Sequence, residues 1–360
     1  MVVYSKTFIS FEPKAEKMSQ IIKVGLIGAG RWGPNVIGAI NRLNDAKLLK
    51  VADPNKESLS NLNLRFPEVT TSHSPTEIFK DDQIDAVAIC TPVETHTELV
   101  KSALESGKHV FVEKPFGNDS KECESLCQLA KDKNLIIVVG HVFLFNASVV
   151  ALKKIIKSGE LGQVLHLEAH RTNLGPVRKD VNAVWDLTSH DLSIFDFLLD
   201  DLPEEVSCLG SCKLDSKNED TTYSTFKYQG GILAHAHASW LNPRKVRQIT
   251  VIGSKKMALW DDLNLDHPIT IYDSSIGLDQ SYYSDSFASH RLSYNRGNVV
   301  LPSIPTNEPL LEEIKHFIDV IQGKEQNRSS GSYGTEVVKT LQFADKSLQN
   351  GGKFLTISRK

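Results

Sequence analysis

The apolar positions between residues 21 and 141 follow two alternating patterns along the chain. Short continuous apolar runs predict buried strands, and the segments between them repeat apolar residues every three or four positions, as helices with one buried face do. The expected strands are 22–27, 48–52, 86–89, 109–112 and 136–139, and the expected helices are 35–43, 56–65, 94–106 and 120–131. This alternation predicts an α/β Rossmann domain with a parallel sheet over residues 21–141.

Beyond residue 141 the pattern changes to longer strand-like stretches in which apolar and polar residues alternate. We expect helices at 149–157 and 309–321, and strands at 164–170, 222–228, 232–240 and 248–253. Such alternation is typical of antiparallel strands with one exposed face, so residues 142–360 are expected to form an α+β domain with a large, mostly antiparallel open sheet. The C-terminal helices can pack back on the Rossmann domain. Segment Leu263–Ser303 is rich in Asp, Ser, Tyr and Asn and is expected to form long loops.

The composition and the N-terminal segment narrow the class of protein. The formal net charge is -3 and the charges are scattered, which argues against a nucleic-acid or membrane partner. Residues 1–20 fit neither a signal peptide nor a membrane span, so we expect an N-terminal extension, with Met18 as an alternative start. The odd number of cysteines, without a secretory signal, predicts reduced thiols in a cytoplasmic protein and no metal site. An open sheet leaves one broad face that another subunit can cover, which predicts a homodimer or homotetramer.

A glycine-rich turn follows the first expected strand and opens the first helix. It matches G-x-G-x-x-G in the run Gly28, Ala29, Gly30, Arg31, Trp32 and Gly33. In this context the backbone N–H groups can face a pyrophosphate, although a plain tight turn is the alternative interpretation. Asp53 ends the second strand, at roughly the 20-residue offset of an acid that accepts hydrogen bonds from the adenosine ribose. This carboxylate would repel a 2′-phosphate, so NAD is expected rather than NADP.

Three ionisable residues are candidates for the chemistry of a hydroxyl or a ketone. Lys114 follows the fifth expected strand, at a carboxyl strand end where ligands of open α/β sheets gather. Asp186 and His190 precede an apolar helix at i,i+4 spacing, which would place both on one side of its first turn. His190 would exchange the hydroxyl proton, Asp186 would orient its ring and favour its cation, and Lys114 would hydrogen-bond the same substrate oxygen. The competing interpretation is a solvated lysine and a helix-capping aspartate beside an uninvolved histidine.

Taken together, these motifs resemble the glucose–fructose oxidoreductase and inositol dehydrogenase family (Gfo/Idh/MocA). The resemblance implies that Lys114, Asp186 and His190 are catalytic. The motifs that carry it are the glycine turn, Cys90-Thr91-Pro92 with His96, Glu113-Lys114-Pro115, and the Asp186 and His190 pair. It assigns the cofactor to Gly28, Ala29, Gly30, Arg31, Trp32, Gly33, Asp53, Cys90, Thr91, Pro92, His96, Glu113 and Lys114.

Within that family, residues 31–35, 140–146 and 178–186 are similar to the nucleotide-sugar branch, which includes UDP-N-acetylglucosamine 3-dehydrogenases. This likeness implies oxidation of the sugar C3 hydroxyl to a ketone, which a pyridoxal-phosphate aminotransferase converts to a 3-amino sugar for lipopolysaccharide or surface polysaccharide. The substrate-binding residues would be Lys114, Arg171, Arg178, Asn182 and His190, with a solvated basic loop as the alternative. Many family members carry an arginine–phenylalanine pair where this chain has Leu144-Phe145-Asn146.

The same residues could serve other reactions. A keto-sugar reductase and an inositol or free-sugar dehydrogenase would need a similar set. A non-catalytic NAD-binding regulator is the alternative from another class, because a fold does not by itself imply activity. The presence of Lys114, Asp186 and His190 argues against the regulator.

Overall fold

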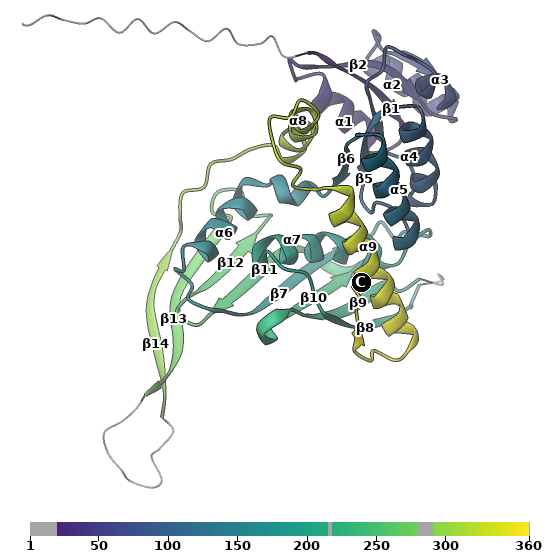
Figure 1. Ribbon diagram of the computed structural model, residues 1–360. Coiled ribbons are helices and arrows are strands. Elements are labelled where there is room, and N and C mark those ends of the chain that lie inside the picture. Colours follow the sequence, from purple (N-terminus) through teal and green to yellow (C-terminus); the bar gives the residue numbers. More distant parts are fainter. Residues whose placement is uncertain (1–19, 215–217, 280–290, 360) are drawn as a thin grey trace, which may run out of the picture.

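The computed structural model describes residues 20–359, except for 215–217 and 280–290, and shows two sheets side by side (Figure 1). The first sheet has six parallel strands in the order β3-β2-β1-β4-β5-β6. This order reverses direction between β1 and β4 and confirms the predicted Rossmann domain. Its elements are β1 (Ile22–Ile27), α1 (Gly33–Ile40), β2 (Ala46–Ala52), α2 (Lys56–Arg65), β3 (Thr70–Ser72), α3 (Thr76–Phe79), β4 (Ala86–Ile89), α4 (His96–Glu105), β5 (His109–Glu113), α5 (Ser120–Asp132) and β6 (Ile137–Gly140).

The central strands of this sheet are buried on both faces because helices cover both sides. All residues of β4 and β6 are buried, and they are the apolar runs that the sequence presents without alternation. Parallel sheets of this kind gather the carboxyl ends of their strands at one edge. That edge faces the second domain and carries the residues that follow β1, β4, β5 and β6.

The second sheet has nine strands in the order β14-β13-β12-β11-β7-β10-β9-β8-β15. Only the pair β7 and β10 is parallel among its paired strands in the described residues, which confirms the expected mostly antiparallel α+β domain. Its elements are α6 (Ala147–Lys157), β7 (Val164–Leu174), α7 (Ser189–Leu199), β8 (Glu205–Ser211), β9 (Thr221–Lys227), β10 (Leu233–Ser239), β11 (Leu241–Gly253), β12 (Met257–Asp261), β13 (Ile269–Asp279), β14 (Arg291–Val300), α8 (Pro309–Ile321), α9 (Gly331–Gln349) and β15 (Leu355–Thr356).

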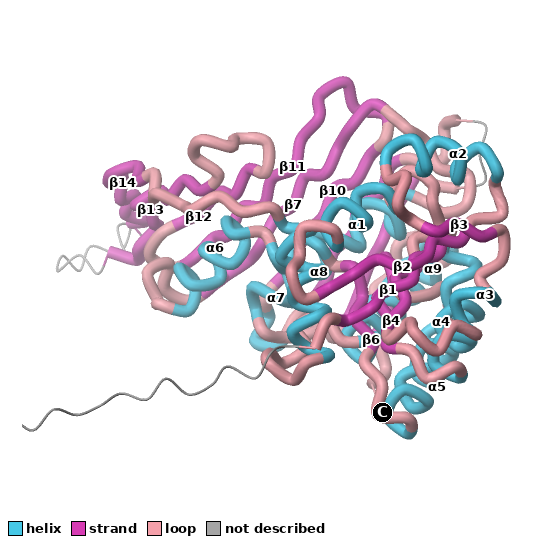
Figure 2. Tube along the Cα trace, turned by 90° about the horizontal axis from the view of Figure 1, so that it is seen from above, coloured by secondary structure: helices cyan, strands magenta, loops and turns pink. Residues whose placement is uncertain are grey.

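Helices α6, α7 and α9 cover one face of this sheet, as Figure 1 and the view from above in Figure 2 show. Leu167 and Ala169 of β7 point to the covered face and are fully buried, whereas His170 on the alternate face is exposed. The period-two pattern of the sequence therefore corresponds to one covered and one open face.

One expectation of the sequence is wrong. Segment Leu263–Ser303, expected to be long loops, contains β13 and β14, which pair with each other and extend the sheet beyond β12. Strands at the edge of a sheet are held by backbone pairing and need few apolar side chains, so composition hid them. The buried Ile269 and Ile271, with a polar residue between them, were the available signal. The expected N-terminal extension, and the alternative start at Met18, lie outside the described residues apart from residue 20.

The two C-terminal helices lie against the Rossmann domain. Helix α8 packs on α1, and its Phe317 ring lies 5.9 Å from the ring of Phe111 on β5. Helix α9 packs on α5, and Ser330 just before it bridges Val138 of β6. In the described part of the chain, no helix combines the length and the apolar character that a membrane crossing requires.

Candidate active site

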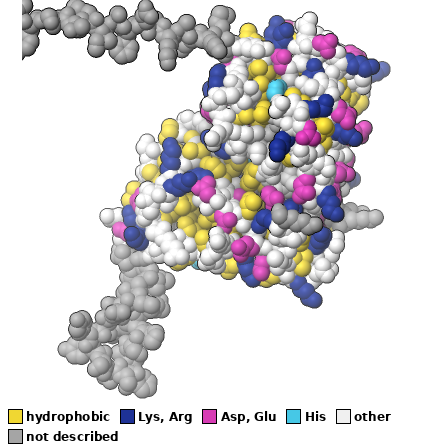
Figure 3. All heavy atoms as spheres, viewed as in Figure 1, with side chains coloured by type: hydrophobic (Ala, Val, Ile, Leu, Met, Phe, Trp, Pro, Cys, Tyr) yellow, Lys and Arg dark blue, Asp and Glu magenta, His cyan; other side chains and the backbone are white. Residues whose placement is uncertain are grey.

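A cavity of about 1120 Å³ lies where the carboxyl edge of the first sheet meets the second domain. Its lining includes Arg31 and Trp32 of the glycine turn, Lys114 after β5 and Arg247 of β11. This volume is at the upper end of the range for small-molecule sites, so it has room for a dinucleotide and a second molecule. On the face shown in Figure 3, side chains of both charges are interspersed rather than segregated.

The glycine turn after β1 has the close backbone packing that a dinucleotide site needs. Gly28 has a φ of 101°, and a Cβ there would lie 2.6 Å from the carbonyl oxygen of Cys90. A Cβ on Gly33 would lie 2.1 Å from the carbonyl oxygen of Gly28, so neither position tolerates a side chain. At Gly30 nothing lies within 4 Å of the corresponding point, which leaves the turn open toward the N-terminus of α1. The turn therefore fits a pyrophosphate.

Asp53 holds this turn to β2. One carboxylate oxygen accepts a hydrogen bond from the N–H of Ala29 at 2.7 Å, and the other accepts one from the N–H of Asn55 at 2.8 Å. Each oxygen keeps a lone pair for a ribose hydroxyl, because a carboxylate can accept about four hydrogen bonds. The carboxylate braces the glycine turn and keeps acceptor capacity for the predicted ribose contact, although Asp53 is buried behind the cavity lining and is not part of it.

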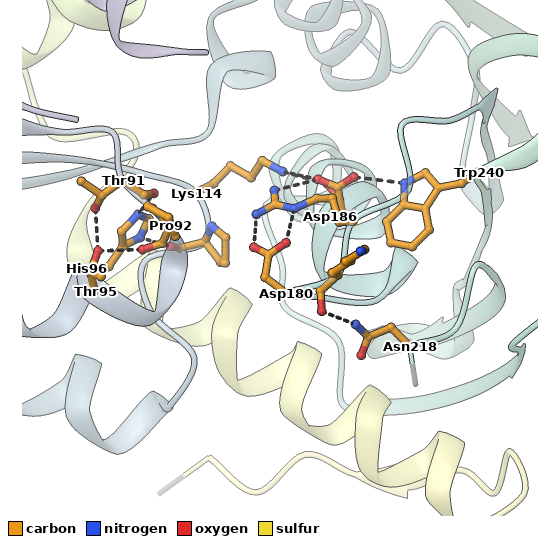
Figure 4. Close-up of polar contacts among 12 residues, drawn as sticks. Thr91, Pro92, Thr95, His96, Lys114, Asp180, Asp186, Asn218 and Trp240 are labelled. Carbon is orange, nitrogen blue, oxygen red and sulfur yellow. Dashed lines mark hydrogen bonds and ion pairs between the residues drawn. The ribbon is translucent and has the colours of Figure 1, made fainter. Parts of the chain in front are cut away.

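His96 links the segments that follow β4 and β5, near Thr91 and Pro115 (Figure 4). The buried ring of His96 lies between the carbonyl oxygens of Pro115, at 2.8 Å, and Thr91, at 2.9 Å. The hydroxyl of Thr95 donates to the main-chain oxygen of Pro92, and this hydrogen bond fixes the Cys90-Thr91-Pro92 segment that follows β4. The ring of His96 therefore supports the wall of the cavity.

Glu113, at the end of β5, also lines the cavity. Its carboxylate accepts a hydrogen bond from the indole N–H of Trp32, which reaches across from the glycine turn. Burial raises the pKa of Glu113 to about 7, against the opposing effects of Lys114 and Trp32. An acid with this pKa changes charge near neutral pH.

Lys114 and Asp186 come from different domains and meet in the cavity (Figure 4). The Lys114 ammonium donates to the main-chain oxygen of Asp186 at 2.8 Å and lies 3.6 Å from its carboxylate. Burial lowers the pKa of Lys114, Asp186 partly restores it, and Arg178 lowers it further. The lysine therefore holds its proton less firmly than a surface lysine.

The Asp186 carboxylate has two further donors. The guanidinium of Arg178 lies 3.2 Å from one oxygen, and the indole N–H of Trp240 donates to the other at 3.2 Å. Arg178 is held in turn by Asp180, and Asn218 donates to the main-chain oxygen of Lys179 in the same loop (Figure 4). Asp186 is consequently fixed by its own domain and presents its charge to Lys114.

The predicted contact between Asp186 and His190 is not formed. Asp186 lies in a π-helical turn, Val184–Thr188, that precedes α7, so the α-helical i,i+4 register does not extend across the pair. In the described residues, Nδ1 of His190 has no hydrogen-bond partner, and its ring packs edge-on against Phe143 at 5.1 Å. Asp186 therefore orients Lys114 and Trp240, and the ring of His190 is positioned by packing.

The expectation that the environment favours the His190 cation is also wrong. Burial lowers the pKa of His190 well below its ordinary value, and the positive charges of Lys114, Arg171 and Arg247 lower it further. The ring is neutral at physiological pH and can accept a proton in the cavity.

The three remaining candidates for substrate contact differ in position. Arg171 and Arg178 line the cavity, but both are paired: Arg171 binds Asp191 at 2.7 Å in a buried ion pair. Asn182 does not line the cavity, because its amide donates to Asp345 at 2.9 Å. Asn182 holds the loop, and the structure does not bring it to the proposed substrate.

Sequence reasoning missed several residues that line the cavity. Trp240 and Phe143 touch the catalytic candidates, and Arg247 forms an ion pair with Asp262 at 3.1 Å. Trp240 lies just beyond β10 and is distant in sequence from Asp186. From sequence alone a tryptophan in a strand is expected to be part of the hydrophobic core, so no local pattern could have linked Trp240 to Asp186.

Two family models match the chain. One, described as an oxidoreductase family with an NAD-binding Rossmann fold, covers residues 22–141. The other, described as the GFO/IDH/MocA C-terminal domain, covers residues 149–259. Together they span more than half of the chain and include Lys114, Asp186 and His190.

Individual relatives differ in what they act on. The myo-inositol 2-dehydrogenase of Thermotoga maritima is 24% identical over 91% of this chain and 96% of its own length. The UDP-N-acetylglucosamine 3-dehydrogenase of Acidithiobacillus ferrooxidans is 26% identical over 68% of this chain and 75% of its own length. The solved structure of GenD2 from gentamicin A biosynthesis, in complex with NAD, has a TM-score of 0.80 at 17% identity and covers 97% of this chain and 100% of that one.

Proposed function

This chain belongs to the GFO/IDH/MocA family of NAD-binding oxidoreductases that act on sugar-like substrates, and from that premise we propose that it oxidises the C3 hydroxyl of UDP-N-acetylglucosamine or a similar nucleotide sugar. NAD, when bound, supplies the acceptor for the hydride that leaves the carbinol carbon. The glycine turn and Asp53 would hold the dinucleotide. The observation that best supports the proposal is that Lys114, Asp186 and a neutral His190 line the same cavity as the glycine turn.

His190 would take the hydroxyl proton. Its ring is neutral because burial and the nearby cations lower its pKa, so it is a base before the reaction begins. The same cations would oppose the imidazolium that forms, so the ring would release this proton to solvent and return to its neutral form. Edge-on packing against Phe143 would hold the ring in place during this transfer.

Lys114 would stabilise the oxygen that loses the proton. Its ammonium is anchored by the main-chain oxygen and carboxylate of Asp186, which leaves N–H groups for a substrate oxygen. A fixed ammonium in a buried site stabilises a developing alkoxide more than water does, because it needs no reorientation. Asp186 would keep Lys114 charged by opposing the effect of burial on its pKa.

The volume of the cavity, about 1120 Å³, supports a substrate larger than a free sugar. The lining also includes Arg247 and Asp262, and Arg247 lies near enough to His190 to lower the pKa of that ring. Arg247 is partly exposed and could exchange its 3.1 Å contact with Asp262 for a phosphate, to which a guanidinium binds with two N–H groups. The resulting 3-keto sugar would be consumed by a pyridoxal-phosphate aminotransferase.

An inositol or free-sugar dehydrogenase is the second candidate. The relative named myo-inositol 2-dehydrogenase matches over a larger share of this chain than the nucleotide-sugar relative does. In addition, Arg171, Arg178 and Arg247 each already carry a carboxylate partner, so the site does not demand an anionic substrate. The closing experiment therefore compares the two substrates directly.

The test follows NADH absorbance while the protein and NAD meet either UDP-N-acetylglucosamine or myo-inositol. An added 3-keto-sugar aminotransferase with glutamate removes an unstable ketone, and the variant His190→Asn is the matched control. NADH formation with the nucleotide sugar alone supports the proposal, and formation with myo-inositol alone favours the second candidate. NAD binding without NADH formation from either substrate contradicts both dehydrogenases, and NADH consumption by a keto-sugar in that case favours the keto-sugar reductase. Binding without turnover of any sugar leaves the non-catalytic regulator.

A further inference from the structure

Glu313 of α8 is a buried acid that no step above uses. Its side chain is fully buried, and neither carboxyl oxygen has a hydrogen-bond partner in the part of the chain that the structure describes. An acid with no partner in this position costs stability, because burial of a polar group without hydrogen bonds is unfavourable. Its surroundings suggest what it does.

The contact of Phe317 with Phe111 turns the Glu313 side of α8 toward β5, and Glu313 lies near enough to Glu113 for the two charges to interact. Phe317 contacts Phe111, and Glu313 lies one turn before Phe317 on the same face of the helix. Glu113 is two residues after Phe111 and therefore points to the same face of the sheet. The helix start at Leu310 lines the cavity, as Glu113 does, so α8 runs from the cavity past Glu113.

The charged and titratable groups around this pair come from neighbouring elements. Cys90 at the end of β4 is affected by both carboxyls, which raise its pKa together with burial. Lys114 faces Glu113, and the buried His141 after β6 has a pKa lowered to about 3 by burial and by Lys114. Burial raises the pKa of Glu313 well above its ordinary value, and Glu113 raises it further. Lys114 thus favours the charged form of Glu113, whereas the charge of Glu113 opposes ionisation of Glu313.

We propose that Glu113 and Glu313 form a buried acid pair that carries at most one negative charge until the oxidised cofactor binds, and that the positive nicotinamide ring of that cofactor draws a proton out of the pair. The proposal rests on the assignment of the dinucleotide to this cavity. A Rossmann crevice places the adenosine on the β2 side and the nicotinamide on the β4 and β5 side, where Glu113 lies. Glu313 is then a positioning residue, which acts on the cofactor through Glu113 and by its own proton.

The sign of the pH dependence follows from the charges. NAD⁺ carries a positive ring and NADH does not, so only NAD⁺ gains attraction when an acid of the pair ionises. Affinity for NAD⁺ should rise with pH around 7, by at most about tenfold per pH unit for one released proton, whereas affinity for NADH should not rise. The pair would therefore shift the relative affinity of the protein from NADH toward NAD⁺ as pH increases.

The experiment measures protons released on binding NAD⁺ or NADH, by calorimetry of the whole protein in buffers of different ionisation enthalpy. We expect wild type to release up to one proton with NAD⁺ near pH 7 and fewer with NADH. In Glu113→Gln the release should persist at a pH set by Glu313, because Glu313 no longer has the charge of Glu113 beside it. In the double variant with Glu313→Gln the release should vanish. Glu312→Gln, on the exposed side of the same helix turn, is the matched control and should behave as wild type.

Infrared difference spectra of the carboxyl C=O stretch keep the test decisive if a variant binds poorly. Near pH 6 each of Glu113→Gln and Glu313→Gln should lose one protonated-carboxyl band relative to wild type. Complete loss of proton release in Glu113→Gln alone, or no band change in Glu313→Gln, would overturn the role of Glu313. These outcomes do not depend on sugar oxidation. Proton-linked NAD⁺ binding without turnover would contradict the proposed function and still support the acid pair.

Discussion

Lys114 and Asp186 join the two domains through a 2.8 Å hydrogen bond from the ammonium to the main-chain oxygen and a 3.6 Å approach to the carboxylate. Through this contact the negative charge of Asp186, in the second domain, acts on Lys114 at the edge of the first sheet where the cofactor would lie. Because Asp186 opposes the effect of burial on the lysine, its removal should lower the pKa of Lys114 further.

Asp186→Asn should therefore reduce turnover and move the loss of activity at high pH to lower pH. A neutral amide no longer favours the ammonium, so Lys114 gives up its proton earlier as pH rises. The pH profile of kcat for sugar oxidation checks this expectation. An unchanged profile with reduced kcat would mean that Asp186 does not act through the charge of Lys114.

Lys114→Ala should lower kcat by about 10²–10⁴-fold, the range typical of general acid–base catalysis, and leave the Kd of NAD nearly unchanged. The expected contacts of the glycine turn and Asp53 with the dinucleotide do not involve this side chain. Lys108→Ala is the control, because Lys108 is also a buried lysine but donates to Asp81 at the opposite end of β5. It should affect thermal stability and not kcat in the folded protein. Equal loss of NAD binding and turnover in Lys114→Ala would contradict the catalytic role.

Trp240→Phe should lower kcat by about 10- to 100-fold, because it removes one N–H donor to the Asp186 carboxylate and keeps an aromatic ring. Hydrogen bonds to charged groups are worth about 1.5–3 kcal/mol, which sets this scale. Trp260→Phe is the matched control: its indole donates to Ser148 at 2.7 Å, away from Asp186. If both variants lose the same activity, packing rather than the Asp186 contact is the cause.

The activity should persist into mildly acidic pH as far as His190 is concerned. A histidine with a lowered pKa stays neutral below its ordinary titration range, so the proton-accepting form remains as pH falls through that range. Arg171→Met should raise the pKa of His190, since it removes one of the cations that hold it down. The acidic limb of kcat/KM should then move to higher pH. A limb that stays in place would show that another group controls it.

The alternating apolar pattern was sufficient for most of the fold. The buried runs of β1, β4, β5 and β6 and the helices between them carry the signal of a parallel sheet in their own residues. Strands β13 and β14, at one end of the second sheet, carry little of it, because they are held by backbone pairing of β13 with β12 and of β14 with β13. The family was likewise visible in local motifs, and the matches to both family models confirm it.

The geometry of the site was harder to predict. Motifs brought Lys114 and Asp186 to attention separately, but the π turn before α7 decides that Asp186 faces Lys114 rather than His190. Trp240 and Glu313 act through tertiary contacts that no spacing encodes. Asn182 looked like a ligand because it lies near the motif, and its amide instead holds Asp345.

A last prediction concerns stability. Asp196 of α7 is buried between the hydroxyls of Tyr228 and Tyr333, which donate to its carboxylate at 2.7 and 3.3 Å. Burial raises its pKa to about 8, whereas an unfolded aspartate ionises near its ordinary value of about 4.

Unfolding between these two pH values releases the proton of Asp196, so this residue should make the folded state less stable as pH rises from about 4 to about 8. The slope is at most about 1.4 kcal/mol per pH unit. Asp196→Asn should flatten this dependence and raise the Tm relative to wild type at pH 8 more than at pH 5. Asp82→Asn, at an exposed position, should leave the slope unchanged. Parallel curves of Tm against pH for wild type and Asp196→Asn would mean that Asp196 is ionised in the folded protein and that its two tyrosine donors outweigh its burial.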